Sequence, residues 1–140
     1  MKREVASYQV GPKLLLRKGS KYLFLYMPRH PWFDWPGGRI DIGEEHVPFE
    51  AILRREVTEE LGSKLKYRIS KPTLIMRRWL KTGEAIVHIY YEAEYISGDI
   101  KLSDEHRDLI WINPRTYRFK PGEFISREEY KSIKQYFNNK

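Results

Sequence analysis

Apolar and polar residues alternate along this chain with two different periods, one typical of strands and one typical of helices. Five segments are rich in apolar and β-branched or aromatic residues and lie between glycine, proline or polar turns. The predicted strands are 13–17, 21–27, 74–80, 85–96 and 109–112. Residues 21–27 are apolar almost throughout, which indicates a central position in a sheet. Short turns between the first two and between the next two strands predict two hairpins.

Proline and glycine mark the expected breaks between these elements. Residues 1–10 are expected to form an irregular strand or an arm that ends at the Gly11–Pro12 break. Residues 28–35 are expected to form a loop, and Pro72 excludes a helix that continues toward residue 74. The first regular strand is therefore expected only after Pro12.

Two other segments repeat their apolar residues every three or four positions. The first lies between Pro48, which suits the first turn of a helix, and Gly62, which suits its end. Its apolar positions are Phe49, Ile52, Leu53, Val57 and Leu61. The second begins at Ser126, whose spacing to Glu129 is that of a capping box, and carries Tyr130, Ile133 and Phe137 on its apolar face. Strands and helices together predict an α+β domain.

The first predicted helix carries a cluster of carboxylates. Glu56, Glu59 and Glu60 are spaced i, i+3 and i+4, so a helix places them on one face, beside its apolar side. Like charges at this spacing destabilise an isolated helix by roughly 0.2–0.5 kcal/mol per pair, unless a cation lies among them. Magnesium prefers such oxygen ligands. The alternative is a solvated acidic face, which is common on helices.

These carboxylates belong to a longer pattern. Gly37 and Gly38 precede Glu44, and Arg55 opens the sequence REVTEELG. The pattern resembles the Nudix box, a glycine, five residues, Glu, seven residues, then Arg-Glu-apolar-x-Glu-Glu-x-Gly-apolar. The matching positions are Gly38, Glu44, Arg55, Glu56, Val57, Glu59, Glu60 and Gly62. The chain departs from it twice: ten residues separate Glu44 from Arg55, an insertion expected around 45–48, and Ser63 follows Gly62.

The resemblance implies a Nudix-type α/β/α sandwich, with a mixed, mainly antiparallel sheet between the two helices. It also implies a site for Mg²⁺ or Mn²⁺ held by Glu56, Glu59 and Glu60, with the carbonyl of Gly38 as a further ligand. The general base would be Glu56 or Glu105. Glu105 precedes a strand containing Trp111, as in many Nudix proteins, and its alternative is an exposed surface residue. Arg55 would pair with Glu44 and fix the junction of loop and helix.

Four residues outside the carboxylate cluster are expected to contact the substrate: Trp32, Trp35, Arg39 and His88. The aromatic residues could stack on a base or simply pack locally, and Arg39 could bind a phosphate or be a surface residue. His88 shares one strand face with Glu92 and Glu94, which is either part of a cleft or an ordinary polar sheet face.

The implied activity is metal-dependent hydrolysis of a diphosphate bond in a nucleoside diphosphate derivative. Candidate substrates are nucleoside triphosphates, nucleotide sugars and dinucleoside polyphosphates, while capped RNA is a weaker candidate. The alternative function is a catalytically silent Nudix-fold module that binds a nucleotide or RNA. The complete set of carboxylates favours the enzyme, because a degenerate module would be expected to lose at least one of them.

Composition bounds the picture further. A chain of 140 residues with 41% hydrophobic and 14% aromatic residues is expected to form a single domain, 1–140. The net charge of +7 favours anionic partners. The absence of cysteine excludes disulfides and suits a cytoplasmic protein. No apolar run is long enough to span a membrane, so no membrane partner is expected. The resemblance also admits a homodimer, since dimers are frequent among such folds.

Overall fold

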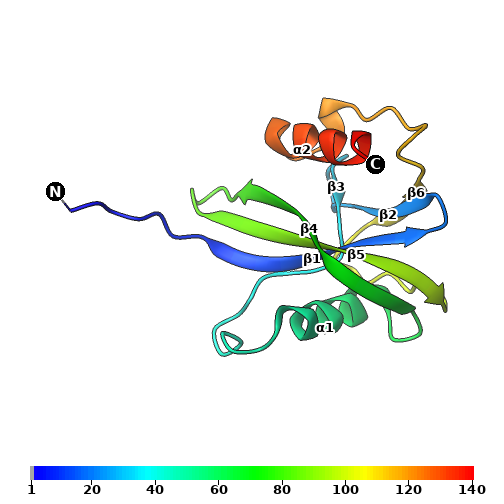
Figure 1. Ribbon diagram of the computed structural model, residues 1–140, viewed down its shortest axis with the longest axis horizontal. Coiled ribbons are helices and arrows are strands. Elements are labelled where there is room, and N and C mark those ends of the chain that lie inside the picture. Colours follow the sequence, from blue (N-terminus) through cyan, green and yellow to red (C-terminus); the bar gives the residue numbers. More distant parts are fainter. Residues whose placement is uncertain (1) are drawn as a thin grey trace.

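A computed structural model describes residues 2–140, in which one mixed sheet lies between two helices (Figure 1). The strands are β1 (Gln9–Lys18), β2 (Lys21–Tyr26), β3 (Phe33–Asp34), β4 (Lys66–Trp79), β5 (Ala85–Ser97) and β6 (Asp108–Ile112). The helices are α1 (Phe49–Leu61) and α2 (Arg127–Asn138), and a short 3-10 helix, η1 (Pro121–Glu123), precedes α2. Met1, part of the predicted arm, lies outside the described residues.

The sheet has the strand order β3-β2-β1-β5-β4, and β6 also pairs with β2. Strands β1 and β5 run parallel, whereas the other four pairings are antiparallel. This arrangement confirms the predicted sandwich with a mixed, mainly antiparallel sheet. The two predicted hairpins correspond to β1–β2 and β4–β5.

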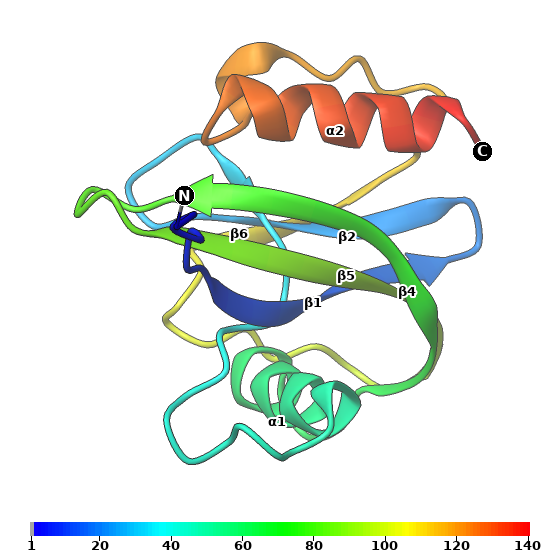
Figure 2. The same ribbon diagram turned by 60° about the vertical axis from the view of Figure 1, so that its left-hand side comes forward.

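Each face of the sheet is covered by one helix (Figure 2). Helix α1 buries its apolar side against leucines of β1 and β2, which include Leu14 and Leu23. Helix α2 buries Ile133 and Phe137 on the opposite face, beside Phe24 of β2. The alternation of side chains along β1 and β2 thus divides the core into two layers.

Two sequence-based boundaries were wrong. Strand β1 passes through Gly11 and Pro12 without a break, because it pairs in parallel with β5 from Gln9 onward. Strand β4 begins at Lys66 and contains Pro72, which lies where the register with β5 is irregular. Proline lacks an amide hydrogen, so it is tolerated at such an irregularity.

Both helices begin and end close to the predicted positions. Gly62 ends α1 with a φ of 90°, and its amide donates to the carbonyl of Thr58. The Ser126 side chain caps α2 by accepting a hydrogen bond from the Glu129 amide (3.1 Å). The carboxylate of Glu129 does not complete the predicted capping box, because it binds Arg78 of β4 instead. Within residues 2–140, no helix is both long and apolar enough to cross a membrane.

Candidate active site

The glycine turn after β3 is pressed directly onto β1. The Gly38 amide donates to the Pro12 carbonyl (3.2 Å), and the Ile40 amide donates to that of Val10 (2.8 Å). Gly37 has a φ of 140°, and a Cβ there would lie 2.1 Å from the Pro12 carbonyl oxygen. Such a contact is closer than van der Waals packing allows, so this position requires glycine. The turn is therefore fixed by the strand beneath it.

The same turn contacts two carboxylates of α1. The Gly37 amide donates to Glu60 Oε2 (2.7 Å). A Cβ on Gly38 would lie 2.6 Å from the Glu56 carboxyl carbon, so the missing side chain makes room for that carboxylate. The Gly38 carbonyl oxygen faces Gly11 of β1, where a Cβ would lie 1.7 Å from it, and its role as a metal ligand stays a prediction.

Glu56 and Glu60 lie in surroundings that oppose their negative charges. Burial, with a hydrogen bond to Glu105, raises the pKa of Glu60 to about 9, although Lys13 and the Gly37 amide act in the opposite direction. Burial and repulsion by Glu59 and Glu105 likewise raise the pKa of Glu56, against the effect of Arg55. Acidic groups crowded in this way are stabilised as anions by a cation placed among them.

Glu105 comes to this cluster from the loop before β6. The proximity of its carboxylate contributes to the raised pKa values of both Glu60 and Glu56. The next residue, His106, is buried and its Nε2 lies 2.8 Å from Asp34 Oδ2, which attaches this loop to β3. The structure thus brings together residues 49 positions apart in the chain, Glu56 and Glu105.

Glu59 lies apart from the other two helical carboxylates. It is exposed, and its Oε1 accepts a hydrogen bond from Arg55 (3.1 Å). Arg55 also binds Glu44 (2.7 Å) and approaches Glu56 (3.4 Å). Within residues 2–140, no three acidic or histidine side chains surround one point as metal ligands would. Glu56 and Glu60 nevertheless fit a hard cation, because both carboxylates lie at the same turn and supply the oxygen atoms that such a cation prefers.

The inserted residues leave the contact between loop and helix intact. The Glu44 amide donates to the Asp41 carbonyl (2.9 Å), and the Val47 amide donates to that of Glu44 (3.0 Å). These bonds form compact turns that end just before Phe49, where α1 begins. The extra length is therefore taken up in turns, and Arg55 still reaches Glu44.

A buried ionic network lies behind the glycine turn, and sequence reasoning missed it. Asp34 accepts hydrogen bonds from Lys13 and Arg78 (3.1 Å each), and Arg78 also binds Glu129 of α2 (2.7 Å). Lys13 donates in addition to the Trp35 carbonyl (2.9 Å), one residue before Pro36. The pKa of Asp34 lies well below its usual value, because Lys13, Arg78 and His106 outweigh the effect of burial. One available signal was Lys13 at the head of an otherwise apolar strand.

Two of the predicted substrate contacts are buried in the interior. Trp35 is fully buried and packs against Phe24 and Tyr90 at ring distances of 5.4 and 5.5 Å. His88 is 3% exposed, and burial together with Lys13 and Arg78 lowers its pKa to about 2. Trp35 cannot stack directly on a base in this arrangement, because its side chain lies fully inside the core.

The other two predicted contacts are accessible. Trp32 is half-buried and stacks on His30 at a ring distance of 4.2 Å. Arg39 is exposed and donates to the side chain of Gln9 (2.8 Å). Both lie in the segments that flank the glycine turn, and their contact with a substrate stays a prediction.

Comparisons with known proteins agree with this fold. The NUDIX domain matches residues 5–133, which shows that the chain belongs to the Nudix family and is a Nudix pyrophosphohydrolase. A MutT protein from Methanosarcina mazei Go1 has a similar structure, with a TM-score of 0.71 and 20% identity over 94% of this chain and 91% of that one. A comparison with curated protein sequences gives no match.

Two further solved structures share the fold. A UDP-X diphosphatase has a TM-score of 0.68 and 13% identity, over 98% of this chain and 66% of that one. An ADP-ribose pyrophosphatase from Streptococcus suis has a TM-score of 0.66 and 12% identity, over 95% of this chain and 92% of that one. At these identities the likeness establishes the fold alone.

Proposed function

We propose that this protein hydrolyses the diphosphate bond of a nucleoside diphosphate derivative in a reaction that depends on Mg²⁺ or Mn²⁺. The observation that carries the proposal is the convergence of Glu56, Glu60 and Glu105 beside Gly37 and Gly38. Burial is the main cause of the raised pKa values of Glu56 and Glu60, and Arg55 and Lys13 offset it only in part, which supports a cation site here. A divalent ion supplies positive charge and, when bound, activates water and neutralises diphosphate oxygens.

The chain's own residues position the carboxylates. Gly37 holds one oxygen of Glu60 through its amide, which leaves the other oxygen free to act as a ligand. Glu56 would be the second ligand and Glu59 the third. The Arg55 guanidinium group pairs with Glu44, Glu56 and Glu59. These ion pairs fix the two helical carboxylates relative to the loop that carries Glu44. Precise placement matters because small errors in position cost large factors in rate.

Glu56 and Glu105 both remain candidates for the general base. Glu105 is exposed and reaches the cluster from a different segment than α1, so it can receive a proton from water at the open side. Glu56 is less exposed and has a raised pKa, which makes it a stronger acceptor when it is ionised. Comparing pH–rate profiles of Glu56→Gln and Glu105→Gln assigns the role, because loss of the base removes the acidic limb of the profile.

The substrate is proposed to be a small nucleotide derivative. The structural neighbours include proteins named UDP-X diphosphatase and ADP-ribose pyrophosphatase, which supports nucleotide sugars as candidates beside nucleoside triphosphates. We infer that the exposed Arg39 would bind a phosphate and that the half-buried Trp32 would contact a base. Trp35 and His88 would act on substrate binding only through the residues that they support.

A turnover screen tests the proposal. The protein is incubated with Mg²⁺ or Mn²⁺ and with nucleoside triphosphates, ADP-ribose, UDP-sugars, dinucleoside polyphosphates and capped RNA, and the products are separated by chromatography. Glu60→Gln serves as the inactive variant. Glu50→Gln is the matched control, because Glu50 lies on the same helix but is exposed and binds only Arg54 (3.2 Å). Equal turnover in both variants would overturn the assignment of the site.

A further inference from the structure

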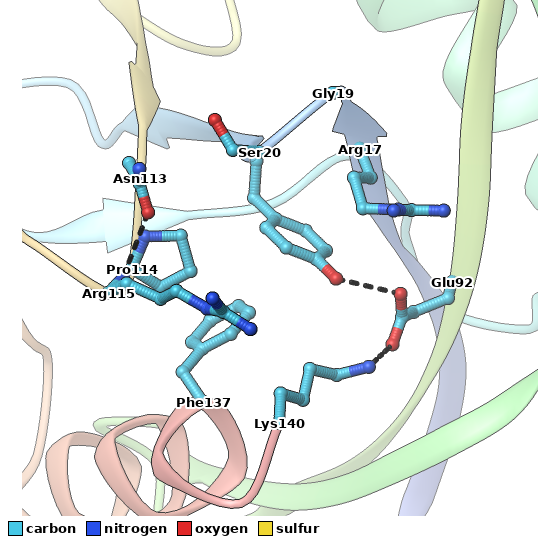
Figure 3. A pocket seen from close by; sticks show the side chains of 10 residues that line it. Arg17, Gly19, Ser20, Glu92, Asn113, Pro114, Arg115, Phe137 and Lys140 are labelled. Atoms are coloured by element: carbon cyan, nitrogen blue, oxygen red, sulfur yellow. Dashed lines mark hydrogen bonds and ion pairs between the residues drawn. The ribbon is translucent and has the colours of Figure 1, made fainter.

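A pocket lies away from the carboxylates of α1, and Figure 3 shows the residues that line it. Its volume is about 800 Å³. Its lining comes from β1, β2, β5, the segment after β6 and the end of α2. The residues are Arg17, Gly19, Ser20, Tyr22, Glu92, Asn113, Pro114, Arg115, Phe137 and Lys140. Such a volume falls within the range of small-molecule sites, roughly 300–1,000 Å³.

This pocket is separate from the Nudix carboxylates in two ways. Lys13 pairs with Gly37 of the glycine turn, whereas Arg17 lies four residues further along the same strand, or about 13 Å at the usual rise per residue. The pocket also lies on the face of the sheet covered by α2, because Tyr22 and Phe137 belong to that core layer. Helix α1 with its carboxylates covers the other face.

The pocket combines three cationic side chains, those of Arg17, Arg115 and Lys140. Arg115 is exposed, and no side chain among residues 2–140 binds its guanidinium group. Figure 3 shows that the Arg115 side chain extends beside Phe137 toward the interior of the pocket. Arg17 is partly used, since it binds Glu94 (2.5 Å), which Arg68 also binds (2.6 Å). A guanidinium group without a protein partner is available for a ligand anion.

The one carboxylate in the pocket wall, Glu92, is already satisfied. Its oxygens accept hydrogen bonds from Tyr22 (2.9 Å), Tyr136 and Lys140. Burial raises the pKa of Glu92, but these three donors outweigh it and the net shift is downward. Lys140 therefore offsets the negative charge of Glu92. Arg17 is paired with Glu94, so within the part of the chain that the structure describes the positive charge of Arg115 remains without a partner. A smaller neighbouring cavity shares Arg17 and Glu92 and adds Arg68.

The floor of the pocket is aromatic. Tyr22 and Phe137 meet edge to face with their ring centres 4.9 Å apart and are each 5% exposed. Their packing gives the pocket a rigid base that can contact a flat or apolar group. The cations lie on the walls around this base, so a ligand with an anionic end and an organic body would match both parts.

We propose that this pocket binds a small organic phosphate, with its phosphoryl group held by Arg115 and its organic part resting on Tyr22 and Phe137. Guanidinium groups match phosphate oxygens through paired, charge-assisted hydrogen bonds. Asn113 and Ser20 add polar groups at the rim. The pocket does not depend on the hydrolase assignment, because it shares no residue with the carboxylate site.

Titration by ¹⁵N–¹H NMR tests the proposal. Phenyl phosphate and inorganic phosphate are added separately to the full chain in EDTA, so that no divalent metal binds phosphate at the Nudix carboxylates. We expect saturable shifts of the Ser20, Asn113 and Arg115 amides, and tighter binding of phenyl phosphate than of inorganic phosphate. Shifts confined to residues 37–60, or no saturation, would overturn the pocket. Equal affinity for both ligands would overturn the role of the aromatic floor.

Paired variants separate the pocket from general surface charge. Arg115→Gln should raise the Kd for phenyl phosphate roughly tenfold, as expected for the loss of one charge-assisted hydrogen-bonding group. Arg127→Gln is the control, because Arg127 is equally exposed but lies at the opposite end of α2. An unchanged Kd should result there. Equal weakening in both variants would mean nonspecific attraction to a basic protein and would overturn the site.

Discussion

Among single residues, Glu60 combines burial with an acidic neighbour. It is 2% exposed, and its pKa is raised to about 9, first by burial and then by Glu105. Without metal, the folded state therefore holds a proton that the unfolded chain releases above pH 4.5. Burying the ionised carboxylate of Glu60 is unfavourable without a cation, and a bound cation would offset this cost.

This argument predicts that Glu60→Gln stabilises the metal-free protein and inactivates the enzyme. Because the pKa of Glu60 is raised on folding, the free energy of unfolding falls as pH rises from 4.5 toward 9. Glutamine resembles the protonated acid and escapes this loss. In EDTA at pH 8, its Tm should exceed that of the original chain by about 3 °C or more, which corresponds to about 1 kcal/mol.

The pH dependence provides the control for this prediction. Well below pH 4.5 the Glu60 side chain is protonated in both the folded and the unfolded state, so the difference in Tm should disappear. Turnover with Mg²⁺ should fall roughly 100-fold or more, as expected when a group that supports charge stabilisation is removed. A variant less stable than the original chain at pH 8 would contradict the role assigned to burial.

The two glycines of the turn after β3, Gly37 and Gly38, are predicted to respond differently to alanine. At Gly37 a Cβ would meet the backbone of Pro12 at 2.1 Å, and the φ of 140° is strained for any other residue. Gly37→Ala should therefore lower the free energy of unfolding by about 2–4 kcal/mol, measured by urea denaturation. At Gly38 the contact is the flexible Glu56 carboxylate, which can move.

Gly38→Ala should accordingly spare the fold and reduce turnover, because Glu56 must leave its position. Gly122→Ala is the matched control, since its Cβ would meet open space and its φ is not positive. We expect that variant to change stability by no more than about 0.5 kcal/mol. Full activity of Gly38→Ala would show that the position of Glu56 beside the turn is not required.

At the level of structural elements, Asp34 joins four separate segments. Lys13 comes from β1, Arg78 from β4 and His106 from the loop that carries Glu105, while Asp34 lies on β3. Arg78 extends the connection to α2 through Glu129. The short strand β3 is thus held by this network as well as by its pairing with β2 and the buried Phe33, and it leads directly into the glycine turn. The network therefore ties the proposed base loop to the proposed metal-binding turn.

Asp34→Asn is predicted to destabilise the protein by about 3–5 kcal/mol at pH 7, because it leaves Lys13 and Arg78 buried without their common partner. Urea denaturation measures this loss. The pKa of Asp34 is lowered on folding, so its contribution is present above about pH 3.8 and is lost as pH falls through the lower folded-state pKa. The difference between variant and original chain should shrink accordingly in acid.

Asp99→Asn is the control for this comparison, because Asp99 is exposed. It should leave the denaturation midpoint unchanged at both pH values. Similar losses from both variants would contradict a specific role for Asp34, and a loss that persists unchanged at very low pH would contradict its ionised state in the fold.

For the whole molecule, local patterns predicted most of the elements, but the short strand β3 lies in a segment that was expected to be a loop and exists through its pairing with β2. Both helices and both hairpins could be predicted because their period, caps and turns lie within a few neighbouring residues. The passage of β1 through Gly11 and Pro12 could not, because it depends on parallel pairing between Gln9 and Ile86. Such pairing leaves no mark in either segment alone.

The candidate site divides in the same way. Glu56, Glu60 and Arg55 could be found from the helix pattern and the resemblance, because the motif is local. The ionic network as a whole could not be predicted: Lys13 at the head of an apolar strand was one signal, but Asp34 and Arg78 resemble surface residues until the fold brings them to it. The burial of Trp35 was missed for the same reason, because its partner Tyr90 lies on a strand far along the chain.

The N-terminal segment gives a last prediction at this scale, because its two parts differ in their contacts. Residues 2–7 are exposed, have no regular structure and extend away from the sheet (Figure 1). Tyr8 makes only peripheral contacts, with Trp79 at a ring distance of 6.5 Å and with Arg77 at 3.5 Å. Deleting residues 2–7 should therefore change the free energy of unfolding by less than about 0.5 kcal/mol and leave turnover unaltered.

A deletion that continues through Gly11 should behave differently. It removes the Val10 carbonyl that binds Ile40 (2.8 Å) and the glycine against which the Gly38 carbonyl packs. The glycine turn then loses part of its support, and the parallel pairing of β1 with β5 is shortened. We expect turnover to fall sharply, with a lower midpoint in urea. If the two deletions behaved alike, β1 would not be the element that positions the turn, and the carboxylates would owe their arrangement to α1 alone.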